Sequence, residues 1–225
     1  MIDYTLYTNS MENPLKLKSL EKLFNLLMSL RSPVRYSHCI RVSKYSEIIA
    51  SALGMSKKQI KYLRIAGMLH DIGFSAMNDR ILDKNTSLTS DEYEYIKLHP
   101  AIGTKILNCY NFPDDIAKGV MQHHEAFDGS GYPLGLKAKQ ISIYGRILFL
   151  SESFDTMTNS MPYKPAYSID VAIKVIKQLS NKYFDPELVD IVLNSEEISS
   201  FYKQKDRITD NVCKDIDLDN INRLF

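Results

Sequence analysis

The sequence predicts an all-α protein, and three observations support that prediction. Glycine and proline number only 9 and 8 among the 225 residues, so turn-forming residues are scarce. Apolar residues recur every three or four positions along much of the chain, as on the buried face of a helix. Ser, Thr or Asp precedes several of these stripes, where a helix N-cap is expected. We therefore expect long helices instead of many short strands.

The composition is that of a folded, soluble chain. Hydrophobic residues make up 44% and charged residues 24%, which excludes a disordered or fibrous protein. The formal net charge is only +1, so we expect no binding of DNA along a whole surface. Cys39, Cys109 and Cys213 include no CxxC pair and indicate free thiols in a reducing compartment. Neither a signal peptide nor the roughly 18 apolar residues of a membrane span is found, so we expect a cytoplasmic protein with no membrane association.

Three helices are expected in the first third of the chain, after a polar lead-in over residues 1–14. The apolar stripe of the first consists of Leu20, Leu23, Phe24, Leu27 and Leu30. The second runs from Pro33 to Gly54, where glycine suits a left-handed cap, and its inward row includes His38. The third follows a cap at Ser56, and its inward row ends at His70. Two histidines therefore face the core.

The middle of the chain alternates loops with helices. Residues 74–88 lack periodicity and predict a loop. Thr89 and Glu92 have capping-box spacing, so a helix should run from there to about His99 and stop or kink at Pro100. Pro113, followed by two aspartates, should open a helix that ends at His123 and His124.

A glycine-containing loop and three helices complete the expected architecture. The loop covers residues 126–141, and a buried central helix follows from Ile143 to Met157. Ser168 should cap a helix to about Leu179, and Asp185 with Pro186 should start a short one. We expect an N-terminal lead-in and helix over residues 1–33, one domain over 34–194 and a tail over 195–225.

All five histidines fall near helix ends or on inward faces. For any one of them, a hydrogen-bonded core histidine is the ordinary interpretation. The adjacent pairs His70-Asp71 and His123-His124 change this balance, because burying imidazoles and carboxylates together costs several kcal/mol unless a cation compensates. The sequence therefore favours a shared metal site.

A series of motifs in this chain resembles the HD-GYP family of metal-dependent phosphohydrolases. The series begins at His38 and reaches FDPELV at residues 184–189. Between them lie HDIG (70–73), LTSDEYEYIKLHP (88–100) and HHEAFDGSGYPLGL (123–136). The resemblance implies a single HD-type bundle of about seven to nine helices with a dimetal centre.

The resemblance also implies a ligand set. The first metal would be held by His38, His70, Asp71 and a carboxylate of the 143–157 helix, and the second by Asp71, His99, His123 and His124. The family pattern places that last carboxylate 28 residues after His124, at Glu152. Asp155, one turn later, is either an alternative ligand or a residue that supports one. Cys39 follows His38 directly and should point away from it into the core.

Two metal ions are expected in this site. Imidazole and carboxylate ligands suit iron, manganese or zinc, and the resemblance favours iron or manganese. Three-metal relatives have an acidic residue one turn before the first histidine, where this chain has Val34. Two metals joined by Asp71 would activate a bridging hydroxide that attacks phosphorus.

The chain departs from the family pattern at the phosphate contacts. Phe74 replaces the usual lysine after HDIG, and Met161 replaces an arginine, whereas Lys164 keeps a cation that could assist at phosphate. Tyr132 either presents its hydroxyl to the substrate or packs. Possible substitutes for the lost charges are Arg80, Lys84 and Arg146, each with a structural alternative.

Three functions remain open on the sequence alone. The first is a phosphodiesterase that opens a cyclic dinucleotide, with cyclic di-GMP and linear pGpG as the expected pair. The second is a catalytically weak module that retains metals and acts as a signalling partner, and the third is a phosphohydrolase of another nucleotide. The resemblance also implies contact of the 126–141 loop with diguanylate cyclase (GGDEF) domains, and an N-terminal helix could form a homodimer.

Overall fold

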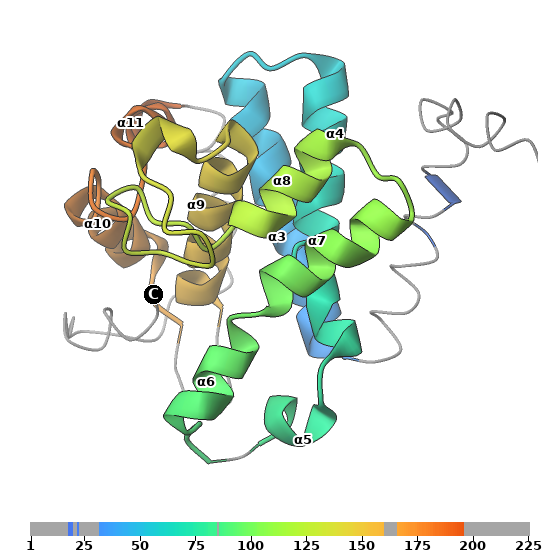
Figure 1. The fold of residues 1–225 in the computed structure, drawn as a ribbon. Coiled ribbons are helices and arrows are strands. Elements are labelled where there is room, and N and C mark those ends of the chain that lie inside the picture. Colours follow the sequence, from blue (N-terminus) through green and yellow to red (C-terminus); the bar gives the residue numbers. More distant parts are fainter. Residues whose placement is uncertain (1–17, 20–21, 23–31, 85, 160–165, 196–225) are drawn as a thin grey trace, which may run out of the picture.

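A computed structural model describes residues 18–19, 22, 32–84, 86–159 and 166–195. Within these ranges the chain forms helices and 3₁₀ turns and no β-strand, which confirms the all-α prediction (Figure 1). The polar lead-in, most of the helix around Leu23 and Phe24, and most of the C-terminal tail lie outside the described residues. The domain boundaries near residues 33 and 194 therefore stay predictions.

Helices α3 (Pro33–Ala52) and α4 (Lys57–Leu69) form a close pair, and both match the sequence prediction. Ser32 caps α3 at the amide of Arg35, and Ser56 forms a capping box with Gln59 at the start of α4. Gly54 between them has a φ of 67°, the left-handed conformation expected of it. A Cβ atom on Gly67 would lie 2.7 Å from the Cα atom of Ser43, so glycine permits the close approach of α4 to α3.

The segment after α4 differs from the predicted loop. Residues Ile72–Ala76 form a 3₁₀ turn, and Asp79–Leu82 form the short helix α5. Helix α6 (Ser90–Ile96) begins with the expected capping box of Thr89 and Glu92 but ends before His99. Helix α7 (His99–Cys109) was not predicted, because Pro100 was interpreted as the end of a helix. Pro100 instead lies in the first turn of α7, where proline is tolerated because no backbone N–H donor is needed there.

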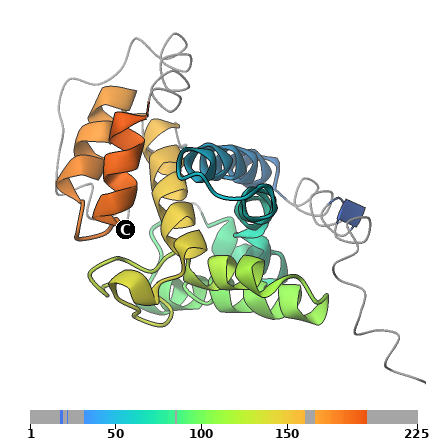
Figure 2. The same ribbon diagram turned by 90° about the horizontal axis from the view of Figure 1, so that it is seen from above.

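The remaining helices match their predicted places. They are α8 (Asp114–Gln122), α9 (Ile143–Thr158), α10 (Ile169–Gln178) and α11 (Pro186–Asn194). Helix α9 is central and packs against α3, α4, α8 and α10 (Figures 1 and 2). Its buried residues include Ile147, Leu148 and Leu150 on more than one face, as expected of a core helix.

The hydrophobic core lies mainly between α3, α4, α8 and α9, with α10 and α11 packed beyond α9. No described helix combines the length and apolar character required to cross a bilayer. The ends of α4 and α8, the first half of α3 and the middle of α9 meet around one buried region, and this region holds the histidines.

Candidate metal centre

The fold brings all five histidines together. His38 lies on α3, His70 at the end of α4, His99 at the start of α7, and His123 and His124 directly after α8. The ring centroid of His70 lies 5.2 Å from that of His38 and 5.1 Å from that of His123. The centroids of His99 and His123 are 5.0 Å apart. These side chains therefore surround one common space.

Three of the rings are held in the same way at helix ends. Each Nδ1 atom bonds to the carbonyl three residues earlier: His70 to Gly67 at 2.8 Å, His99 to Ile96 at 2.9 Å and His123 to Val120 at 2.6 Å. These carbonyls belong to the last turns of α4, α6 and α8, where no following helical amide is available to them. A carbonyl can only accept, so Nδ1 carries the proton in each ring and Nε2 presents its lone pair to the centre.

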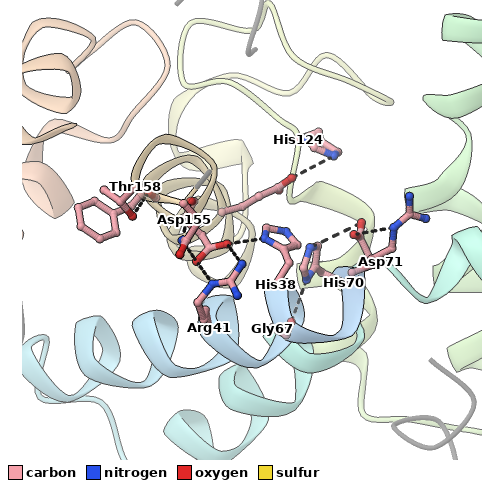
Figure 3. Close-up of polar contacts among 12 residues, drawn as sticks. His38, Arg41, Gly67, His70, Asp71, His124, Asp155 and Thr158 are labelled. Atoms are coloured by element: carbon pink, nitrogen blue, oxygen red, sulfur yellow. Dashed lines mark hydrogen bonds and ion pairs between the residues drawn. The ribbon is translucent and has the colours of Figure 1, made fainter. Parts of the chain in front are cut away.

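The possible ligand atoms form two neighbouring groups. One group consists of His38, His70 and Glu152, and the other of His99, His123 and His124, with the ligand atoms of each group within 4.8 Å of one another. Asp71 lies between the groups. Its Oδ1 atom is 3.6 Å from Nε2 of His70 (Figure 3). The same atom is 3.5 Å from Nε2 of His99. This arrangement brings together all seven ligand residues that the sequence predicted.

The donor atoms themselves fit divalent cations. Among the described residues, Nε2 of His70 and Oε2 of Glu152 are buried polar side-chain atoms without a hydrogen-bond partner. The Nε2 atoms of His99 and His123 are 3.0 Å apart, although both rings use their proton at Nδ1. Two lone pairs that face each other, and a buried unpaired carboxylate oxygen, are unfavourable without a positive charge between them. A pair of cations bound by these atoms would satisfy them.

Burial also sets the protonation of the site. It lowers the pKa of His70 to about 4, and it lowers the pKa values of His123 and His124 well below the usual value, so these rings are neutral. Burial opposes ionisation of Asp71 as well, but His70, His99 and the Arg35 guanidinium outweigh it and hold the pKa of that carboxyl below its usual range. Burial, Asp71 and Asp155 raise the pKa of Glu152 well above its usual value. Neutral imidazoles and a carboxylate that needs a positive partner are suitable metal ligands.

Asp155 forms a hydrogen bond with the candidate ligand His38, which is the contact that one of its two expected roles requires. Its Oδ2 atom accepts from Nδ1 of His38 at 2.7 Å (Figure 3). Arg41 donates from Nε to Oδ1 at 2.7 Å and from Nη2 to Oδ2 at 2.9 Å, and Asn159 also donates to Oδ1 at 2.7 Å. Both oxygens of Asp155 are therefore used by donors. Since Nδ1 of His38 bonds to Asp155, its Nε2 atom is left to act as a ligand.

A family model for the HD domain matches residues 22–188. The chain belongs to the HD domain family. This match confirms the resemblance that the HDIG and HHEAFDGSGYP motifs indicated.

Curated relatives and a solved structure agree with the assignment. The chain is 39% identical over 187 residues to "Cyclic di-GMP phosphodiesterase" of Thermotoga maritima. This match covers 82% of the chain and 51% of the relative. It is 36% identical over 155 residues to "Cyclic di-GMP phosphodiesterase response regulator RpfG" of Xanthomonas campestris, covering 68% of this chain and 41% of the relative. The chain therefore spans about half of these relatives or less.

The crystal structure of a cyclic GMP-AMP specific phosphodiesterase of Vibrio cholerae, V-cGAP3, has the same fold. The two chains superpose with a TM-score of 0.60 at 20% sequence identity, covering 81% of this chain and 53% of the other. This likeness confirms the HD-type helical bundle.

A cavity of about 390 Å³ opens beside the histidines of the HD domain. Its walls include Arg35, Arg41, Thr156 and Asn159 as well as the candidate ligands. Tyr132, one of the expected substrate residues, also lines it and stacks on His124 with the ring centroids 4.6 Å apart and an interplanar angle of 22°. Burial raises the pKa of the Tyr132 hydroxyl, so the hydroxyl stays protonated and can donate a hydrogen bond.

The structure gives Arg146 a different role from the expected substrate contact. Its Nη1 atom forms an ion pair with Asp185, and its Nε atom donates to the carbonyl of Ile141 at 3.0 Å. Of the two roles considered for Arg146, these contacts support the structural one, because its guanidinium joins α9 to the start of α11. Lys164 and Met161 lie outside the described residues, so the role of Lys164 stays a prediction.

The other two candidate cations are also placed away from the cavity walls. Lys84 forms an ion pair with Glu92 at 2.5 Å, and Arg80 is exposed on α5. Cys39 is fully buried, as expected, although its Sγ atom lies within 4.8 Å of ligand atoms of His70 and Asp71. Burial raises the pKa of the Cys39 thiol well above its usual value, which favours a packing role.

Sequence reasoning missed three residues that shape the site. Arg41 and Arg35 line the cavity from α3, and Glu125 holds the loop that carries Tyr132. Glu125 is buried and accepts from the amides of Leu134 at 2.6 Å and Leu136 at 2.9 Å. Its position directly after His124, ahead of the glycines of the loop, was the signal available in the sequence.

Proposed function

We propose that this HD domain is a metal-dependent phosphodiesterase that opens cyclic di-GMP to linear pGpG. The observation that carries the proposal is the convergence of five imidazoles, Asp71 and Glu152 on one buried space, with ligand atoms left unpaired. The names of the two curated relatives support the substrate class, although the chain spans only part of each. The 390 Å³ volume of the adjoining cavity is within the usual range for small-molecule sites.

Two divalent ions are proposed, one for each group of ligand atoms. His38, His70 and Glu152 would hold the first, and His99, His123 and His124 would hold the second, with Asp71 between them. The mixture of nitrogen and oxygen donors is compatible with iron or manganese, which we propose as the metals. Val34, in place of an acidic residue near His38, supports two ions instead of three.

The chain itself contributes orientation and charge. A bound metal pair would supply an activated water and offset the negative charge on the phosphate. Asp155 holds His38 in position, and the backbone carbonyls hold His70, His99 and His123, so the donor atoms are fixed before a metal or substrate binds. Tyr132 offers a protonated hydroxyl on the wall of the cavity, and Lys164 is the proposed cation at the phosphate.

Turnover by the metal-loaded, reduced protein tests this function. We expect release of linear pGpG from cyclic di-GMP, detected by chromatography, and loss of that release in His70→Ala. Cyclic di-AMP and 3′,3′-cGAMP in the same assay test the choice of base. The proposal fails if no linear dinucleotide is released and wild type and His70→Ala behave alike. Metal analysis that found three iron or manganese ions per chain would contradict the two-metal site.

A second function is favoured by one observation, the aromatic ring of Phe74 in place of the usual lysine. On this alternative the domain retains metals and binds a cyclic dinucleotide without hydrolysing it, as a signalling module. Calorimetric titration and turnover on the same sample separate the two functions, because binding without product supports the module. Contact of the 126–141 loop with a GGDEF domain and formation of a homodimer are further proposals, testable by co-purification and light scattering.

A further inference from the structure

Phe74 lies between a metal-site histidine and an arginine. Its ring stacks on His99, with the centroids 4.1 Å apart and an interplanar angle of 13°. On the same ring, the Cζ atom of Arg35 lies 3.9 Å from the centroid. The aromatic residue that replaces the lysine therefore contacts a different cation, which comes from another helix.

The position of Arg35 on α3 directs it toward the site. Arg35 is three residues before His38, so both side chains lie on one side of the helix. Its Nε atom is 3.9 Å from Oδ2 of Asp71, beyond hydrogen-bond distance, and 27% of its side chain is exposed. In the described part of the chain its guanidinium has no hydrogen-bond partner. The stack on Phe74 thus holds the group without using its donors.

Arg35 also lies where two cavities meet. It lines the 390 Å³ cavity beside the metal ligands and a second cavity of about 210 Å³, whose walls include Asp79 and Asp83. A substrate that placed its phosphate beside the candidate ligands and another part in the second cavity would have both parts next to the Arg35 guanidinium.

The balance of charge around the cavity favours an anion at this point. Among the described residues that line the larger cavity, the permanent cations are Arg35 and Arg41. Arg41 is committed to Asp155 through two hydrogen bonds. Among these two described cations, Arg35 is therefore the one whose guanidinium forms no hydrogen bond to the described part of the protein. A planar guanidinium suits phosphate oxygens because it donates two parallel hydrogen bonds, and stacking on an aromatic ring orients it.

We propose that Arg35, oriented by Phe74, is the phosphate-binding cation of this site and replaces the lysine that active relatives carry at position 74. The inference rests on the proposed function, since it assigns a contact to the same phosphodiester substrate. It explains the loss of the lysine as a relocation of positive charge from the 3₁₀ turn to α3.

Equilibrium binding of linear pGpG, the expected product, tests the inference in metal-loaded protein by calorimetry, with chromatography to verify that the pGpG stays intact during the titration. Arg35→Gln should weaken binding about ten- to a hundred-fold, as expected for a lost charge-assisted hydrogen bond. Adding a lysine in the double variant Arg35→Gln/Phe74→Lys should recover most of that loss. Arg80→Gln is the matched control, because it removes an exposed positive charge of α5 and should leave the affinity unchanged.

Metal content and the melting temperature are measured on every variant, so that loss of the site or of the fold is recognised. If Arg35→Gln is unfolded, the milder variant Arg35→Lys, which keeps the charge but not the planar fork, should bind pGpG more weakly than wild type at equal metal content. Wild-type affinity in folded, metal-loaded Arg35→Gln would overturn the inference and leave the proposed function intact. Wild-type protein that neither binds pGpG nor hydrolyses cyclic di-GMP would instead refute the proposed function, and the inference with it.

Discussion

The Nδ1 atom of His38 donates a hydrogen bond to Oδ2 of Asp155 over 2.7 Å, joining α3 to α9 at the candidate metal centre. Arg41, one turn further along α3, holds the same carboxylate through two hydrogen bonds. Burial would raise the pKa of Asp155, but the hydrogen bonds from His38 and Arg41 outweigh this and lower it. The ionised carboxylate therefore fixes the orientation of His38, and this relationship can be tested separately from ligation.

Asp155→Asn should weaken metal binding without removing a ligand. The amide group can no longer satisfy both His38 and Arg41 as an acceptor, so His38 loses its fixed orientation. The metal dissociation constant should rise about ten- to a hundred-fold, measured by competition with a fluorescent chelator. Asp190→Asn, at an exposed position of α11, is the control and should retain the wild-type value. Unchanged affinity in Asp155→Asn would show that His38 does not depend on this contact.

Metal removal should lower thermal stability. The buried lone pairs of His70 and Glu152 favour the folded state only when a cation is bound to them. At a thousandfold excess over its dissociation constant, a bound ion adds about 4 kcal/mol to the free energy of unfolding, and a chelator would remove it. For a domain of this size the melting temperature should fall by about 10 °C.

Variants identify the source of that shift. His70→Ala should show a smaller difference between metal-loaded and chelated samples than wild type, because one of the two groups of ligands is incomplete. Cys109→Ser, at an exposed thiol outside the site, should keep the full shift. An equal shift in His70→Ala and wild type would place the stabilising metal elsewhere.

Local signals in the sequence were sufficient for most of the helices. The cap at Ser56 and the capping box of Thr89 and Glu92 were both predicted, and both are formed in the structure. Helix α7 was missed because Pro100 stops a preceding helix and starts a following one equally well. Pro100 was interpreted only as the end of a helix, whereas tertiary packing decides whether a proline ends one helix or begins the next.

The candidate ligands were predictable, and Asp155 was predicted with two alternative roles, but the contacts of Arg41 and Arg35 were not predictable. Motif spacing identified Glu152, since the number of residues along the chain stays the same in any fold. The contact between Arg41 and Asp155 joins residues 114 positions apart and depends on how α3 packs against α9. The position of Arg35 over Phe74 likewise depends on the packing of α3 against the 3₁₀ turn. Neither contact follows from the local pattern.

Glu125 should control the order of the loop that carries Tyr132. Glu125→Ala leaves the amides of Leu134 and Leu136 without their buried acceptor, at a cost of about 2 kcal/mol in stability. Hydrogen exchange should become faster in residues 126–141, and Tyr132 should lose its fixed stack on His124. Ser130→Ala, at an exposed position of the same loop, is the control. Slow exchange that persists in Glu125→Ala would show that the glycines and Pro133 order the loop without Glu125.

Asp185 should give the domain an acid-sensitive contribution to stability. Burial would raise the pKa of this carboxyl, but hydrogen bonds from Lys139 and Arg146 outweigh it, so the folded-state pKa is below the usual value. A group with a depressed folded-state pKa stabilises the protein fully above its unfolded pKa of about 3.9, and the contribution is lost as the pH falls through the folded-state value.

Urea unfolding of Asp185→Asn and wild type measures this contribution. At pH 7 the variant should be less stable by about 3 kcal/mol, because Arg146 is left without its buried partner. The difference should shrink below about pH 4, where the Asp185 carboxyl of the unfolded wild-type chain begins to take up its proton while that of the folded chain does not. Glu187→Gln is the matched control, since Glu187 contacts the same Lys139 from an exposed position and should change stability by less than about 1 kcal/mol. A difference between Asp185→Asn and wild type that stays constant with pH would mean that the charge on Asp185 does not stabilise the junction of α9 and α11.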